Sequence, residues 1–248
     1  MTYCVGMLVG DGLVMIADTR TNAGVDDISV YRKLHTLADE PDRLVFAATA
    51  GNLSTSQMVL AQLAEGLPSM AQDDAPRRIG DMPSMFRVAQ LVGEAIQNAR
   101  ASIGRALEAA SLDTGVSMLL GGRVGDGPLM LYRLYPEGNF IECQREQPFL
   151  QIGETKYGKP ILDRALQYDT PIEEVVKVGL ISFDSTLRSN LAVGRPLDLV
   201  VVPADRSRGV IARRLGTDDA YFNDLSARWS LMLNEARATI PDPPFMLN

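Results

Sequence analysis

Thr2 is the residue of this sequence with the clearest capacity for chemistry, because it directly follows the initiator Met1. A small residue at position two normally lets the initiator methionine be removed, which would leave a threonine with a hydroxyl and a free α-amine. That amine has an unperturbed pKa of roughly 7.7–8.0 and can act as a base near neutral pH. A threonine hydroxyl activated by its own amine is a known nucleophile. Since many proteins begin Met-Thr, the hypothesis needs supporting groups elsewhere.

A β-hairpin is predicted immediately after Thr2. The apolar runs Tyr3–Val9 and Leu13–Asp18 flank Gly10-Asp11-Gly12, which is a strong turn signal. With the turn centred near Asp11, residue 2 would pair with residue 20 or 21 of the second strand. Thr2 would then lie beside the end of that strand.

Asp18 and Arg20 provide charge at this strand end. Their spacing places both on one face of the strand, beyond the apolar Val14 and Ile16 of that face. A carboxylate and a guanidinium at the end of an apolar strand indicate a polar site, although an ion pair on the surface would give the same pattern.

Lys33 begins the next predicted strand, close in sequence to the same end. A buried lysine near a threonine hydroxyl can lower its effective pKa and stabilise the alkoxide, provided that Asp18 keeps the lysine charged. The alternative is an ordinary solvated lysine.

Other kinds of site are disfavoured by elimination. His35 is the only histidine, and no G-x-S-x-G segment accompanies it, so a Ser-His-Asp triad is not expected. Multi-histidine metal sites are impossible, and we expect no metal and no cofactor. Two cysteines, Cys4 and Cys143, are too few for a disulfide framework or a zinc cluster, and we interpret both as apolar core residues. Gly153–Lys159 fits a phosphate-loop spacing, but Pro160 follows where Ser or Thr is required.

Charge and hydropathy place the chain among soluble globular proteins. The net charge of −7 argues against nucleic acid or an anionic membrane as the main partner. No apolar run reaches the ~18 residues of a membrane span, and no secretory signal is evident, so the cytoplasm is the expected compartment.

The elements that must position these residues come in blocks of strands and pairs of helices. After the hairpin we expect strands at Lys33–Leu37, Arg43–Thr49, Val116–Leu120, Leu129–Leu134, Phe140–Gln144 and Leu197–Val202, and helices at Ser54–Leu67, Met85–Ala110, Lys156–Gln167, Ile172–Leu187 and Asp218–Ala238, with a loop at Pro68–Pro83. Hairpins and consecutive helices favour an α+β fold with antiparallel sheets over a doubly wound one. We expect one domain over residues 1–248, with a C-terminal helical extension from about residue 218.

Thr2, Asp18-Thr19-Arg20, Lys33 and the strand end Phe46-Ala47-Ala48-Thr49-Ala50-Gly51 together resemble proteasome-type N-terminal nucleophile hydrolases, the family of proteasome β-subunits and the bacterial HslV peptidase. The order and spacing match over the first 55 residues, and a fainter match continues to about Val202. The runs at 21–26 and 184–190 and the long C-terminus are most similar to the bacterial ancestral β-subunit branch, Anbu.

The resemblance implies a four-layer αββα sandwich and a reaction at an amide carbonyl. Thr2 Oγ would attack that carbonyl while the freed α-amine carries the proton, and Lys33 and Asp18 would tune the nucleophile. The backbone N–H of Gly51 would help to hold the oxyanion, a contribution of typically ~3–4 kcal/mol. Glycine at that position is explained by close approach of substrate to the backbone.

The sequence departs from the family pattern near the expected amine-binding groups. Relatives usually carry R-D-x-x-S-G, whereas this chain has Arg188-Ser189-Asn190, with Ser189 at the position of the aspartate. A G-S-G segment of relatives is replaced by Gly153-Glu154-Thr155. Ser189 is therefore the supporting residue that we assign, and Asp184, Ser185 and Glu154 are further residues that could compensate.

Three functions remain open at this stage. The first is a threonine peptidase or amidase that acts through Thr2 on peptides or other amides; the others are a catalytically weak or silent self-assembling subunit and an acylase for a non-peptide amide. The resemblance also implies a homo-oligomeric ring or open spiral. Met85–Ala110 and the last helix, with Trp229, Leu231 and Leu233, are candidate contact surfaces. Whether an ATPase docks on the assembly stays open.

Overall fold

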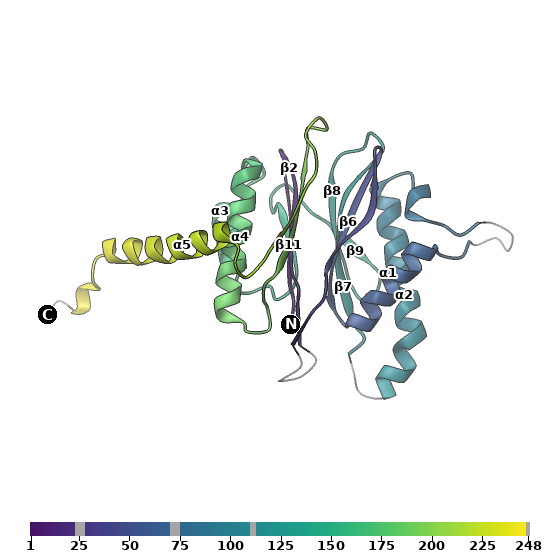
Figure 1. Ribbon diagram of the computed structural model, residues 1–248, viewed down its shortest axis with the longest axis horizontal. Helices are drawn as coiled ribbons and strands as arrows, with labels where there is room; N and C mark the ends of the chain where they lie inside the picture. The colour runs from purple at the N-terminus through teal and green to yellow at the C-terminus, as the bar shows by residue number, and fades with distance from the viewer. Residues whose placement is uncertain (23–27, 70–74, 110–112, 247–248) are drawn as a thin grey trace.

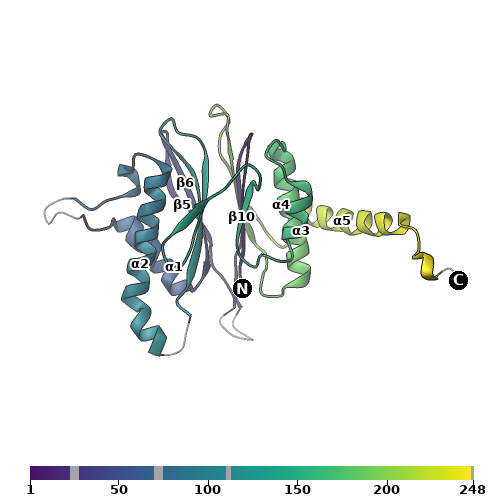
Figure 2. The same cartoon turned by 180° about the vertical axis from the view of Figure 1, so that it is seen from behind.

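Two antiparallel sheets of five strands face one another, and a pair of helices covers the outer face of each (Figures 1 and 2). This computed structural model describes residues 1–22, 28–69, 75–109 and 113–246. The order helix, sheet, sheet, helix confirms the predicted αββα sandwich. Two predicted features, the run at 21–26 and the loop Pro68–Pro83, fall partly outside the described residues.

The first sheet has the strand order β10 (Phe149–Gly153), β1 (Tyr3–Val9), β2 (Gly12–Asp18), β11 (Leu197–Pro203) and β12 (Ile211–Leu215). The second has the order β5 (Leu34–Glu40), β6 (Arg43–Gly51), β7 (Val116–Val124), β8 (Met130–Leu134) and β9 (Phe140–Glu142). A small ribbon pairs β3 (Arg20–Asn22) with β4 (Ile28–Val30).

Helices α1 (Leu53–Glu65) and α2 (Met85–Ala109) cover the second sheet, and α3 (Lys159–Ala165) and α4 (Ile172–Ser189) cover the first. Short 3-10 turns lie at Ile79–Asp81 and Pro244–Met246. Helix α5 (Ala220–Thr239) packs against α4 only at its start, where Phe222 and Leu225 are buried, and then projects away from the body (Figures 1 and 2).

The core explains why β2 is apolar at nearly every position. Leu13 and Met15 point into the space between the sheets, while Val14 and Ile16 point toward the helices. A strand buried on both faces reads as a continuous apolar run and not as an alternation. Its one charged residue, Asp18, comes at the end of the strand and is also buried.

The predicted helices and long strands are all present, with ends that differ by a few residues, but β3, β4, β10 and β12 were missed. Strands β3, β4 and β10 are only three to five residues long, which is too short for a clear hydrophobic pattern. Strand β12 is an exposed edge strand that carries two arginines. Helix α3 begins at Lys159 and not at Lys156, with Gly158 as its N-cap residue and Pro160 in its first turn. Both cysteines are buried and unpaired, as predicted.

None of the helices within the described ranges has the length and apolar composition needed to cross a membrane.

Helix α2 approaches the β8–β9 turn through two glycines. A Cβ atom at Gly93 would lie 2.2 Å from the carbonyl oxygen of Gly138, which itself has φ of +82°. In an exposed helix, Gly to Ala stabilises by ~1 kcal/mol. Here the added methyl would collide with backbone, so the sign of the effect should reverse.

We therefore predict that Gly93→Ala lowers the free energy of unfolding by about 1–3 kcal/mol, the usual cost of overpacking. Gly80→Ala is the control, because a Cβ at Gly80 meets no atom within 4 Å. Urea unfolding of both variants tests the contact, and an equal or greater stability of Gly93→Ala would contradict it.

Candidate active site

Thr2 lies at the start of β1, between the ends of β2 and β10. The β1–β2 pairing runs from Val9–Gly12 to Cys4–Ala17, and its extension places Thr2 opposite Thr19. The predicted partner, residue 20 or 21, was wrong by one or two positions because the turn closes tightly on residues 10 and 11. Because Met1 precedes Thr2, the nitrogen of Thr2 is a peptide nitrogen in this chain. The Met1 residue itself is 65% exposed.

On its other side, Thr2 faces the end of β10. Tyr3 pairs with Gly153, and the N–H of Glu154 donates to the Thr2 carbonyl at 2.6 Å. Gly153 has φ of +78°, and a Cβ atom there would lie 2.0 Å from the Thr2 carbonyl oxygen. Only glycine allows this approach, so Gly153 is required to bring β10 against Thr2.

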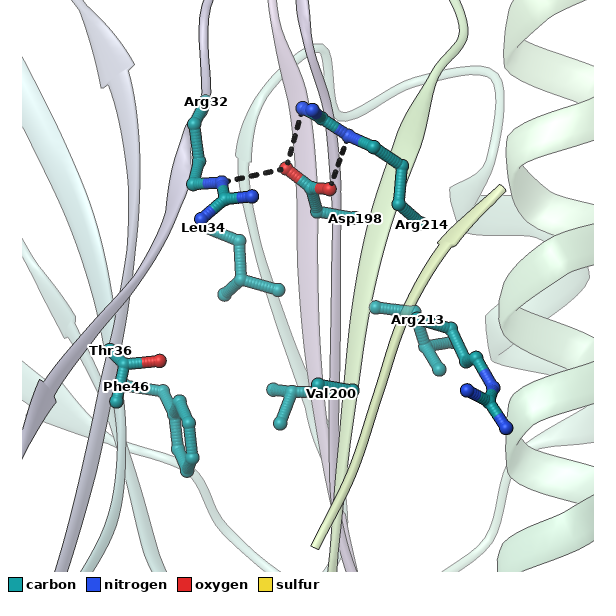
Figure 3. Close-up of a pocket in the computed structure, with 10 residues that line it drawn as sticks. Arg32, Leu34, Thr36, Phe46, Asp198, Val200, Arg213 and Arg214 are labelled. Atoms are coloured by element: carbon teal, nitrogen blue, oxygen red, sulfur yellow. Dashed lines mark hydrogen bonds and ion pairs between the residues drawn. The ribbon is translucent and has the colours of Figure 1, made fainter. Parts of the chain in front are cut away.

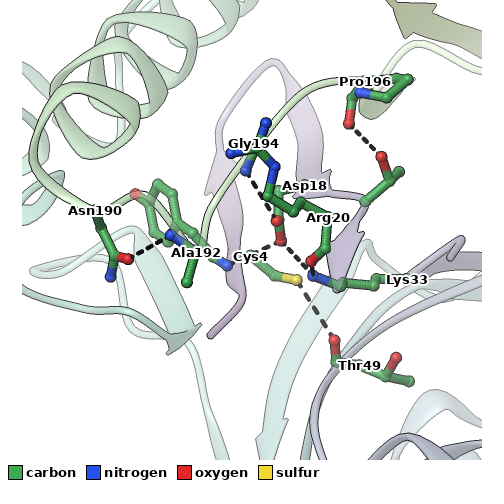
Figure 4. Close-up of polar contacts among 11 residues, drawn as sticks. Cys4, Asp18, Arg20, Lys33, Thr49, Asn190, Ala192, Gly194 and Pro196 are labelled. Atoms are coloured by element: carbon green, nitrogen blue, oxygen red, sulfur yellow. Dashed lines mark hydrogen bonds and ion pairs between the residues drawn. The ribbon is translucent and has the colours of Figure 1, made fainter. Parts of the chain in front are cut away.

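Asp18 and Lys33 form a buried ion pair next to Thr2. Lys33 Nζ donates to Asp18 Oδ1 at 2.8 Å and to the Arg20 carbonyl at 2.5 Å. Asp18 also accepts from the Tyr3 N–H at 3.1 Å and from the Gly194 N–H at 3.3 Å (Figure 4). The carboxylate thus holds the lysine, the start of β1 and a distant loop at once.

Burial and charge act against one another at Asp18. Burial raises the pKa of its carboxyl, and the Lys33 ammonium and the two backbone N–H groups oppose that shift. An ammonium has three hydrogens, and two of those of Lys33 have acceptors among the described residues. The third has no acceptor among the described residues, and Lys33 also lines the cavity described next.

That cavity has a volume of about 350 Å³. It is lined by Met1, Thr2, Thr21, Lys33, Thr49, Ala50, Gly51, Leu53, Ser56 and Gly153. The structure therefore brings Thr2, Lys33 and Gly51 to one cavity, with Asp18 behind Lys33.

Gly51 is exposed at the end of β6, but the reason for a glycine differs from the one expected. Its φ is +110°, and a Cβ atom would lie 2.3 Å from the carbonyl oxygen of Gly115. A side chain at position 51 is therefore excluded by the backbone of Gly115, just before β7. The contact with substrate that we expected is not needed to explain the glycine.

Arg20 contacts the ion pair through its backbone carbonyl, whereas Ser189 lies outside the cavity. The Arg20 guanidinium donates to the Leu191 carbonyl at 2.9 Å, so it holds the loop after α4, while its own carbonyl accepts from Lys33. Ser189 is exposed in the last turn of α4 and is not among the residues that line the cavity.

Asn190 and Glu154 are the polar residues that sequence reasoning did not place. Asn190 Nδ2 donates to Glu154 Oε2 at 3.0 Å, and the Ala192 N–H donates to Asn190 Oδ1 at 3.0 Å. The Lys156 N–H donates to Glu154 Oε1 at 2.8 Å, which shapes the turn before α3. Glu154 follows Gly153 directly, and the C-cap position of Asn190 after α4 was the available signal.

The Asp184 carboxylate binds Ser226 and Arg188, so it does not replace the aspartate that is missing from the R-D-x-x-S-G motif. Ser226 Oγ donates to Asp184 Oδ1 at 2.6 Å, and the Arg188 guanidinium donates to the same carboxylate at 3.1 Å. These bonds fasten the start of α5 to α4.

A second cavity of about 250 Å³ opens between the edges of the two sheets (Figure 3). Asp198 is buried there, with Arg214 at 2.9 Å and Arg32 at 3.7 Å. These arginines satisfy the carboxylate, so the cluster links the beginning of β5 to β11 and β12. Its described lining provides one hydroxyl, on Thr36, and one carboxylate, on Asp198, which the two arginines already bind.

The ion pair at Asp18 can be tested by its cost when broken. Asp18→Asn should lower the free energy of unfolding by about 3–5 kcal/mol, because Lys33 would remain buried without a counter-charge. The double variant Asp18→Asn/Lys33→Met should recover part of that loss.

Asp163→Asn is the matched control, since Asp163 forms an exposed ion pair with Lys159 and should cost less than about 1 kcal/mol. The four proteins are compared by urea unfolding. Equal losses for Asp18→Asn and Asp163→Asn would show that the buried pair has no special role.

Two of the three comparisons with known proteins found relatives. No protein-family model matches the chain. Among curated proteins, the proteasome subunit beta of Haloquadratum walsbyi is 24% identical over 208 residues, which are 82% of this chain and 74% of that protein.

Solved structures are more similar. Anbu (ancestral beta-subunit) from Yersinia bercovieri is 39% identical with a TM-score of 0.87, and the match covers 97% of this chain and 98% of that one. The helical assembly of the Anbu complex from Pseudomonas aeruginosa is 43% identical with the same TM-score, over 99% of this chain and all of that one. The chain therefore belongs to the Anbu family of proteasome-type ancestral β-subunits.

Proposed function

We propose that the chain is a threonine hydrolase that cleaves amide bonds of peptides through Thr2, once the residue before it has been removed. The observation that carries this proposal is the buried Asp18–Lys33 pair beside a cavity that Thr2 and Gly51 also line. A buried cation next to a hydroxyl lowers the cost of forming the alkoxide, which is what a threonine nucleophile needs.

The reaction follows from these positions. Thr2 Oγ attacks the carbonyl carbon while its proton passes to the α-amine, and the backbone N–H of Gly51 helps to hold the oxyanion. The ammonium then gives its proton to the leaving amine, which departs and leaves an ester on Thr2. Water, deprotonated by the same α-amine, attacks the ester; the acid product leaves and Thr2 Oγ recovers its proton.

Removal of Met1 is essential to this reaction. A peptide nitrogen is no base, whereas a free α-amine titrates near neutral pH. Met1 lines the cavity and is largely exposed, so the bond between Met1 and Thr2 lies at the surface that a processing enzyme must reach.

We also propose that the chain forms a homo-oligomer. A relative from Pseudomonas aeruginosa is described as a helical assembly. In this chain, the projecting part of α5 exposes Leu231, Met232 and Leu233, each at least half accessible. A helix that leaves the body with apolar side chains uncovered needs a partner surface to be stable.

A catalytically silent assembling subunit is the second candidate. It is favoured by the changes around Thr2, where Glu154 and Asn190 stand in the segments in which relatives carry G-S-G and R-D-x-x-S-G. Under this hypothesis the fold and the assembly persist while the amine is held in an unreactive state.

Covalent capture distinguishes the two. Protein shown by intact mass to lack Met1 should react with a peptide epoxyketone or β-lactone, and the adduct should map to Thr2. Thr2→Ala should abolish the adduct and the hydrolysis of a peptide amide, while Thr2→Ser should retain both in reduced measure.

Thr36→Ala, which removes a hydroxyl in the other cavity, should behave like the parent protein. An unmodified Thr2 in processed protein would instead support the silent subunit. Turnover of small amides without turnover of unfolded protein would indicate an acylase.

The contact surface on α5 has its own test. Leu231→Asp should reduce the assembled mass measured by light scattering, because a charge would replace an apolar contact. Asn234→Asp adds the same charge one turn away without removing an apolar side chain. Equal masses for both variants and the parent would exclude Leu231 from the interface.

A further inference from the structure

We infer that Glu154, oriented by Asn190, holds the α-amino group of Thr2 at the position from which it exchanges the hydroxyl proton. The inference rests on the proposed function, because it assigns the partner of the amine that this function requires. Three observations carry it: the position of Glu154, the charge state of its surroundings, and the loop that connects it to Asp18.

Glu154 is the cross-strand neighbour of Thr2. Extension of the β1–β10 register by one position from Tyr3–Gly153 places the two residues opposite each other, and the Glu154 N–H donates to the Thr2 carbonyl. Opposed residues in an antiparallel pair have Cα atoms about 4.5–5.5 Å apart. A side chain at this position is therefore within reach of the nitrogen of Thr2.

The Glu154 carboxylate is buried and has no cationic partner among the described residues. The side chain is almost fully covered, and it accepts from the Asn190 amide and the Lys156 N–H, one on each oxygen. None of the ion pairs formed among the described residues includes Glu154. Buried carboxylates are normally paired with a cation, and two more lone-pair positions remain on this one. The ammonium form of a freed Thr2 would supply the missing charge.

The loop of residues 190–194 joins the two carboxylates on either side of Thr2. At one end Asn190 holds Glu154. At the other end the Gly194 N–H donates to Asp18 (Figure 4). Asn190 Oδ1 accepts from the Ala192 N–H, which keeps the amide group turned toward Glu154. The loop thus sets the distance between the group that holds the amine and the group that holds Lys33.

Several ionisable groups lie on the elements next to Thr2. Glu154 follows β10, Asp18 ends β2 and Lys33 precedes β5, whereas the Tyr3 hydroxyl of β1 is directed toward Ser182 and Gln151. Burial raises the pKa of Tyr3 to about 12, so that residue stays neutral. The ionisable groups on these elements also include the Cys4 thiol of β1, which burial keeps neutral by raising its pKa. Asp18 and Lys33 compensate each other at 2.8 Å, which leaves Glu154 as the uncompensated charge.

This predicts the direction of a pH effect. A carboxylate beside an amine favours the ammonium and raises the pKa of the amine. Since the free amine is the base, activity is lost as the pH falls through that pKa. Removing the charge of Glu154 should lower the amine pKa and move the acidic limb of kcat/KM to lower pH.

Glu154→Gln is the variant, because the amide keeps the size of the side chain and can still accept from Lys156 N–H. We expect the acidic limb of kcat/KM for a fluorogenic peptide amide to move down by about one pH unit, the size of a single close charge. Glu146→Gln is the matched control: it removes the same charge from an exposed residue beyond the opposite end of β10. Its limb should coincide with that of the parent.

A second readout does not depend on activity. Reductive methylation with 13C-formaldehyde labels the α-amine, and the NMR titration of the labelled methyl groups gives its pKa, expected to be lower in Glu154→Gln than in parent and control. If Glu154→Gln does not fold, Asn190→Ala removes the amide that orients the carboxylate, and its limb should move in the same direction by less.

The outcomes separate the inference from the proposed function. Processed parent protein that reacts at Thr2 while Glu154→Gln leaves both the limb and the amine pKa unchanged would overturn the inference alone. Processed protein that never reacts would overturn the proposed function, and the NMR titration would still decide the role of Glu154. Protein that retains Met1 has no Thr2 amine, and both would fail together.

Discussion

The buried ion pair between Asp18 and Lys33 is the interaction on which the rest of this site depends. Two charges removed from water are tolerated only when geometry and additional hydrogen bonds compensate for the lost hydration. Here the compensation comes from segments far apart in sequence: the Tyr3 N–H, the Arg20 carbonyl and the Gly194 N–H. The pair therefore determines where β1 starts, where β2 ends and where the loop after α4 lies.

The two sheets make this ion pair possible because they shield it from water. β1 lies between β2 and β10, so the residue before it has a backbone neighbour on both sides. Lys33 directly precedes β5 of the opposing sheet and lies at the end of the apolar layer to which Ala17, Leu34 and Ala48 belong. Because Thr2 stands at the edge of that layer, the lysine beside it is shielded while the threonine still opens onto a cavity.

The parts of the site that could be predicted from the sequence are those joined by local structure. Thr2, Asp18 and Lys33 are linked by one tight hairpin and the short ribbon that follows it, so their spacing along the chain is enough to bring them together. The error in register was small because the turn is a short Gly-rich one. The fold class was predictable for a related reason, since long apolar strands and paired helices leave few alternatives.

The parts that escaped prediction depend on contacts across most of the chain. Glu154 meets Thr2 only because β10 pairs with β1, and β10 is a five-residue strand without a distinctive pattern. Ser189 was chosen by alignment to a motif, yet α4 continues through that residue and turns it to the surface, so that Asn190 is the first residue of the loop to face inward. The reason for Gly51 was likewise invisible, since it depends on the carbonyl of Gly115.

Under the proposed function, the residue opposite Thr2 affects both the position and the basicity of the amine. A short polar residue opposite Thr2 would position an amine without changing its charge, whereas the Glu154 carboxylate adds a full negative charge in a buried place. Such a charge stabilises the ammonium, and each unit by which the amine pKa rises above the ambient pH reduces the fraction of free base about tenfold. The same contact would therefore hold the amine firmly and slow the first proton transfer. If Glu154 binds the amine as we infer, Thr2 would gain a fixed amine position and lose part of the basicity of that amine.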